Sequence, residues 1–121
     1  MEKYIETIIV GTGFSGIGAA IQLQKENLTD FLIIEKAAKT GGTWRDNFYP
    51  GAACDVMSHL YSFSFELNPD WSRSFSPQQE IFNYIQACFI KHGLDKKTQF
   101  NTELISAAFD EQNGQWIINT N

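Results

Sequence analysis

The sequence predicts an α/β fold that begins with one strand–helix–strand unit. Residues 5–10 form a run rich in β-branched side chains that leads directly into glycine, a pattern typical of a buried strand in a parallel sheet. From Phe14 to about Lys25, apolar residues recur at helical spacing. A second apolar run, residues 31–34, ends at Glu35 and predicts the next strand. Two such strands joined through a helix make a βαβ unit.

A long irregular segment follows this unit. Residues 36–75 contain glycines and prolines without a sustained period, which predicts a loop rather than a helix or strand. Eight aromatic side chains in the segment need a surface to pack against, so the sequence favours an ordered loop over a disordered one. They are Trp44, Phe48, Tyr49, Tyr61, Phe63, Phe65, Trp71 and Phe75.

The last third of the chain predicts a second helix, a third strand and a hairpin. Ser76 with Gln79 forms a capping-box pattern, and Pro77 between them suits the first helical position. Gly93 is a natural stop for this helix. Residues 98–100 are a candidate third parallel strand. Residues 104–109 and 116–119 flank Asn113-Gly114, a strong signal for a β-hairpin (β-meander) at the C-terminal end.

Composition excludes several classes of function. The chain has 121 residues, 43% of them hydrophobic and 19% charged, which is typical of one globular domain. A net charge of -5 with scattered basic residues argues against a nucleic-acid or anionic membrane partner. Four glycines interrupt the longest apolar stretch, residues 8–23, and Glu2 and Glu6 precede it, so we expect neither a signal peptide nor a membrane anchor. We therefore expect a cytoplasmic protein.

The two cysteines do not suggest a metal or disulfide site. Cys54 and Cys88 show no spacing with His59 or His92 that would form a metal site, so we expect no bound metal. Buried, reduced thiols that pack as small apolar side chains are the simpler interpretation.

The sharpest local signal is the sequence Gly11-Thr12-Gly13-Phe14-Ser15-Gly16, which lies between the first predicted strand and helix. Gly11 permits a tight turn, Gly13 lets the backbone approach a pyrophosphate, and Gly16 lets helix and strand pack closely. Glu35 ends the second strand, where a carboxylate can accept hydrogen bonds from ribose hydroxyls. The acid disfavours a 2′-phosphate, so NADP is not expected at this site. The pattern predicts a dinucleotide site but does not separate FAD from NAD.

A second set of motifs resembles a known family. The sequence Gly41-Gly42-Thr43-Trp44, four further residues, Tyr49-Pro50-Gly51, three further residues and Asp55 is similar to the flavin-proximal segment of class B flavoprotein monooxygenases, in particular Baeyer–Villiger monooxygenases. The run from Ser58 to Phe65, followed by Trp71, Phe75 and Ser76-Pro77-Gln78, also resembles that family. The resemblance covers nearly the whole chain but only the N-terminal FAD-binding portion of the family.

The resemblance implies a role for individual residues. The glycines of the motif, Gly11, Gly13 and Gly16, would contact the FAD pyrophosphate, with Glu35 at the adenosine ribose. Thr43 and Trp44 would lie along the flavin end, Tyr61 against the same wall, Asp55 close to the flavin ring and Leu104 at the adenine. The implied cofactor-binding residues are Gly11, Gly13, Phe14, Ser15, Gly16, Glu35, Lys36, Gly42, Thr43, Trp44, Asp55, Tyr61 and Leu104.

Asp55 is the one catalytic residue that the resemblance implies. In the family, an aspartate at this position holds an active-site arginine beside the flavin, and a positive charge there stabilises a developing anion. The only arginines of this chain, Arg45 and Arg73, do not match that arginine, which comes from a later region in the family. Asp55 therefore represents half of a pair.

The family reaction gives the functional expectation. NADPH reduces FAD, O2 adds to form a C4a-peroxyflavin, and this species oxidises a small organic substrate, either a ketone or a heteroatom. Residues 1–121 are expected to be a partial FAD-binding domain of Rossmann-like fold, without the NADPH-binding region and the remaining substrate regions. Such a fragment is expected to be inactive alone and to self-associate through exposed aromatics. The alternatives are a fragment of an N-hydroxylating or dimethylaniline-type flavin monooxygenase and a non-catalytic nucleotide-binding module.

Overall fold

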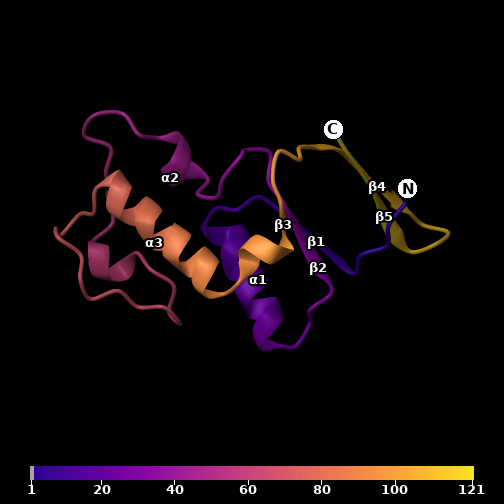
Figure 1. Cartoon of the computed structure of the whole chain (residues 1–121), viewed down its shortest axis with the longest axis horizontal. Helices are drawn as coiled ribbons and strands as arrows, with labels where there is room; N and C mark the ends of the chain where they lie inside the picture. The colour runs from indigo at the N-terminus through magenta and orange to yellow at the C-terminus, as the bar shows by residue number, and fades with distance from the viewer. Residues whose placement is uncertain (1) are drawn as a thin grey trace.

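A computed structural model describes residues 2–121 as a three-stranded parallel sheet, two longer helices, a long ordered loop and a separate β-hairpin (Figure 1). Short helical turns interrupt the loops. The elements in chain order are β1 (Thr7–Val10), α1 (Phe14–Lys25), β2 (Phe31–Ile34), α2 (Thr43–Asp46), the 3-10 turn η1 (Ser58–Leu60), α3 (Gln78–Lys91), the 3-10 turn η2 (Leu94–Lys97), β3 (Thr98–Gln99), β4 (Leu104–Asp110) and β5 (Gln115–Thr120).

The sheet confirms the predicted βαβ unit. The strand order is β1-β2-β3, and both pairs are parallel. In this register Thr7 pairs with Phe31 and Val10 with Ile34, so the two strands end side by side. The carboxyl ends of parallel strands therefore place the loop after β1 next to Glu35, which follows β2.

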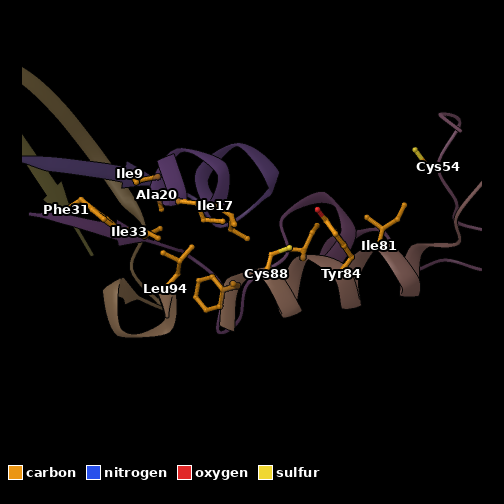
Figure 2. Packing of buried hydrophobic residues seen from close by; sticks show 13 residues of the cluster. Ile9, Ile17, Ala20, Phe31, Ile33, Cys54, Ile81, Tyr84, Cys88 and Leu94 are labelled. Atoms are coloured by element: carbon orange, nitrogen blue, oxygen red, sulfur yellow. The ribbon is translucent and has the colours of Figure 1, made fainter. Parts of the chain in front are cut away.

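The hydrophobic core lies between the sheet and the two longer helices (Figure 2). Ile17 and Ile21 on α1 and Ile81 and Ile85 on α3 are fully or almost fully buried, because apolar positions recur on one face of each helix. Ile33 of β2 meets them from the sheet. Cys54 and Cys88 are both free and buried, as the sequence predicts.

The start of α3 differs from the prediction. The helix begins at Gln78, with Pro77 as its N-cap residue and no side-chain capping bond. The capping box does not form, because Ser76 is buried and its hydroxyl lies 2.6 Å from that of Ser58, while Gln79 bonds Asn83. A contact between residues distant in sequence therefore replaces the local cap. The predicted end holds, since Gly93 follows the helix with φ 65°.

The hairpin lies at one end of the molecule, and α3 and the aromatic loop (residues 44–75) lie at the other (Figure 1). β4 and β5 are antiparallel, with Phe109 opposite Trp116 and Ala108 opposite Ile117. Gly114 closes the turn at φ 65°, in line with the predicted Asn-Gly signal. Ile105, Phe109, Trp116 and Ile117 are each about half exposed or more. The hairpin thus presents apolar side chains that no other described element covers.

Candidate functional site

The loop after β1 has the geometry that its glycines predict. Gly11 adopts φ 95°, a conformation open chiefly to glycine, and its N–H donates to Ile34 O at 2.8 Å. A Cβ on Gly16 would lie 2.0 Å from Gly11 O, so only glycine permits this approach of helix and loop. Gly13 is the N-cap of α1, and Ile17 N–H is the first to bond back to it, at 3.1 Å. The earlier N–H groups of the helix have no partner within it.

Glu35 is buried, with 4% of its surface exposed, and its carboxylate accepts hydrogen bonds from two loops. Oε2 accepts from Thr12 N–H at 2.9 Å and from Thr12 Oγ1 at 2.6 Å. Oε1 accepts from Ala37 N–H at 2.9 Å, and Arg45 Nη1 lies 3.2 Å away as an ion pair. Burial raises the pKa of Glu35, but these hydrogen bonds and the charge of Arg45 outweigh it and leave the pKa below its ordinary value. The carboxylate is therefore ionised at neutral pH.

The segment before α2 packs directly on the glycine loop. Thr12 O accepts both Gly41 N–H at 3.1 Å and Thr40 Oγ1 at 2.9 Å. Gly42 comes so close that a Cβ on it would lie 2.9 Å from Gly13 Cα. Thr43, the next residue, lines the same pocket as Val10 at the end of β1.

These segments enclose one pocket of about 470 Å³. It brings together seven of the predicted cofactor residues, which are Gly11, Gly13, Glu35, Lys36, Gly42, Thr43 and Leu104. Sequence reasoning missed Arg45, Asp46, Thr102 and Glu103, which also line it. Thr102 N–H donates to Glu35 O at 2.9 Å and so fastens the segment before β4 to the end of β2. No local sequence signal marks these residues, because the chain returns to the pocket only through its tertiary fold.

Three other predicted residues form an aromatic cluster beyond the pocket. The Phe14 and Tyr61 rings meet edge to face at 5.1 Å, and Trp44 meets Tyr61 at 5.8 Å. Trp44 Nε1 also donates to Tyr61 Oη at 3.1 Å. Ser15 is exposed in the first turn of α1, and neither it nor Gly16 lines the pocket.

Asp55 lies in the loop between α2 and η1. It is exposed, and the backbone around it is fixed by Cys54 N–H to Ser76 O at 2.9 Å and by Ser58 N–H to Ser74 O at 2.8 Å. It does not line the pocket of Glu35. The structure therefore does not place Asp55 with the glycine loop, although it holds its backbone in an ordered position.

A second cavity of about 390 Å³ lies beside α3, away from the glycine loop. Trp71, Glu80, Tyr84 and Cys88 are among its lining residues. Burial raises the pKa of the Cys88 thiol. Within residues 2–121, no group of His, Cys, Asp and Glu side chains is placed to hold a metal ion, and no helix is long and apolar enough to cross a membrane.

Known proteins are similar to this chain in sequence and in fold. The chain matches the NAD(P)-binding Rossmann-like domain family over residues 9–87. It is 54% identical over 114 residues to a Baeyer–Villiger monooxygenase of Pseudomonas aeruginosa, covering 94% of this chain and 22% of that protein. Cyclohexanone-bound cyclohexanone monooxygenase superposes with a TM-score of 0.88 at 34% identity, covering 96% of this chain and 24% of the other.

The OTEMO complex with FAD and NADP superposes with a TM-score of 0.87 at 26% identity, covering 99% of this chain and 23% of the other. The chain spans about a fifth of the length of the curated relatives that it matches. The expected Rossmann-like fold and the similarity to Baeyer–Villiger monooxygenases are thereby confirmed. The chain belongs to the NAD(P)-binding Rossmann-like domain family, and its homologues include Baeyer–Villiger monooxygenases.

Proposed function

We propose that the chain is the FAD-binding part of an NADPH- and O2-dependent flavoprotein monooxygenase that oxidises ketones or heteroatoms of small organic substrates. The observation that carries this proposal is the pocket in which the glycine loop meets the buried carboxylate of Glu35. Two homologues named Baeyer–Villiger monooxygenase are 54% and 45% identical to this chain over nearly its whole length. A related structure contains FAD and NADP.

The pocket suits the adenosine and pyrophosphate end of FAD. A Cβ on Gly13 would meet only Gly42 Cα, at 3.8 Å, so the backbone is open to a phosphate at this point. The N-terminus of α1 supplies N–H groups and a partial positive charge. The ionised Glu35 accepts hydrogen bonds, which is what ribose hydroxyls need. Lys36 and Leu104 lie at the same pocket, where the ribose and adenine would be bound.

The flavin end would lie along the cluster of Phe14, Trp44 and Tyr61. FAD supplies electron transfer from NADPH and the activation of O2 when it is bound. In this chain the aromatic side chains and Thr43 would orient the flavin, and Asp55 would hold the arginine of the active site. That arginine would lie in the part of the relatives that this chain does not span, because Arg45 is engaged by Glu35 and Asp46.

Residues 1–121 form a partial FAD-binding domain in this proposal. The NADPH-binding region and the remaining substrate walls lie in the part of the relatives that this chain does not span. The protein acts in the cytoplasm, with neither nucleic acid nor membrane as a partner, consistent with its net charge of -5. Exposed Phe48, Tyr49, Leu60 and Trp116 favour self-association of the isolated chain. Sedimentation velocity over a range of concentrations tests the last point.

Flavin retention tests the proposed cofactor. The purified chain is mixed with FAD, desalted and scanned between 350 and 500 nm; we expect bound flavin that a large excess of NAD does not displace. The same sample is expected not to oxidise NADPH. Displacement of the flavin by NAD would contradict the assignment of FAD as the cofactor. NADPH oxidation by this chain would contradict the proposal that the NADPH-binding region lies outside it.

A further inference from the structure

Arg45 is the one arginine that reaches the buried carboxylate of Glu35. Its side chain is 9% exposed, and Nη1 lies 3.2 Å from Glu35 Oε1. The same nitrogen donates to Lys39 O at 2.8 Å, and Nε and Nη2 donate to the two carboxylate oxygens of Asp46 at 2.7 and 3.0 Å. The guanidinium is thus fixed on three sides, and its place does not depend on the contact with Glu35 alone.

The two oxygens of Glu35 differ in the capacity that they have left. A carboxylate oxygen accepts about two hydrogen bonds. Oε2 already accepts two, both from Thr12. Oε1 accepts one hydrogen bond, from Ala37 N–H, and makes the ion pair with Arg45. Oε1 therefore retains capacity for a ribose hydroxyl, and Arg45 is the counter-charge beside it.

We infer that Arg45 is a positioning residue of the adenosine end: together with the hydrogen bonds from Thr12 and Ala37, its guanidinium keeps Glu35 charged and turned so that Oε1 can accept a ribose hydroxyl. This inference rests on the proposed FAD site. The other charged groups that line the same pocket are Lys36, Asp46 and Glu103. Of these groups, Asp46 forms an ion pair with Arg45 at 2.7 Å. Among the residues that contact the Glu35 carboxylate, Arg45 carries the positive charge.

The first test measures Glu35 directly and needs no cofactor. Carboxyl carbon NMR follows the titration of Glu35 in the wild-type chain and in Arg45→Gln, Arg45→Lys and Arg73→Gln. Arg45→Gln is expected to raise the pKa of Glu35, because the burial of the carboxylate is then less well offset. Arg45→Lys keeps the charge and should restore most of the shift, and Arg73→Gln is the matched control. An unchanged titration in Arg45→Gln overturns the inference.

The second test links Arg45 to the ligand through a double-mutant cycle with FAD as titrant. Arg45→Gln should weaken FAD binding at pH 7.5 by about three- to tenfold, equivalent to the loss of a contact to a charged group, and should move the acid limb of the binding profile upward. In a Glu35→Gln background the same substitution should have no further effect. Additive losses would show a merely structural role and overturn the inference.

The two proposals fail in different ways. If the wild-type chain binds no FAD, the proposed function fails, and the NMR titration still decides whether Arg45 sets the charge of Glu35. If the wild-type chain binds FAD and Arg45→Gln matches it in affinity and pH profile, the proposed function stands and the role of Arg45 is refuted.

Discussion

Two glycines of the loop after β1 differ in what a methyl group would meet. On Gly16 a Cβ would overlap Gly11 O, whereas on Gly13 it would meet one atom at ordinary contact distance. We expect Gly16→Ala to lower the free energy of unfolding by about 2 kcal/mol or more, since helix and loop must move apart. Thermal unfolding measures this change.

Gly13→Ala is the matched comparison. It should cost less than about 1 kcal/mol of stability, because its φ of -81° suits alanine. It should nevertheless weaken FAD binding about tenfold or more, because the methyl group occupies the approach to the pyrophosphate. Equal losses of stability in the two variants would contradict this division between packing and binding.

The carboxyl group of Glu35 links stability to pH. Its folded-state pKa lies below the ordinary value of 4.5, so its contribution to stability is present above that value and is lost as pH falls through the folded pKa. The melting temperature of Glu35→Gln should therefore lie below that of the wild type at pH 7, and the difference should shrink below about pH 4.5. Melting curves from pH 3 to 7 measure it, with the exposed Glu111→Gln as control. A difference that grows with acidity would contradict the assignment.

Tyr84 of α3 anchors the aromatic loop through two hydrogen bonds to its backbone. Its hydroxyl donates to Glu66 O at 2.6 Å and accepts Phe63 N–H at 2.9 Å, and burial raises its pKa. We expect Tyr84→Phe to destabilise the chain by about 1–3 kcal/mol, because two backbone groups lose their partner. Chemical denaturation measures this, and the exposed Tyr49→Phe should be neutral. A neutral Tyr84→Phe would show that the loop is held by packing alone.

The elements that the sequence predicts well are those with several agreeing local signals. Residues 14–25 have helical spacing directly after a glycine turn, and α1 has these bounds. The first strand starts two residues later than predicted, at Thr7. The predicted cap of α3 is wrong, because the hydroxyl of Ser76 forms a hydrogen bond with Ser58, which is distant in sequence. The four-residue α2 is too short for periodicity to reveal.

The candidate site shows the same limit. Gly11, Gly13 and Glu35 were predictable, because the strand–glycine–helix context fixes where they meet. Arg45 was not, because its approach to Glu35 depends on the path of residues 36–44. The prediction of Asp55 as a catalytic residue remains a prediction, since the structure places it apart from the pocket.

Apolar side chains are exposed at both ends of the molecule. The hairpin exposes Phe109 and Trp116, and the aromatic loop exposes Phe48 and Tyr49. Such patches mark surfaces that contact another body of protein. The relatives are several times longer than this chain, and in the proposed enzyme their additional length would cover these surfaces.

The most direct test of the account is an NMR titration of the labelled chain with FAD. Amide resonances of Gly11, Gly13, Glu35 and Leu104 should shift together and saturate at one FAD per chain, because they line one pocket. The same titration of Glu35→Ala should need a much higher FAD concentration. The claim that FAD binds at the glycine loop would be contradicted if saturating FAD left the Gly11 and Gly13 resonances in place. It would also be contradicted if FAD instead shifted the resonances of Trp71 and Tyr84, which line the cavity beside α3.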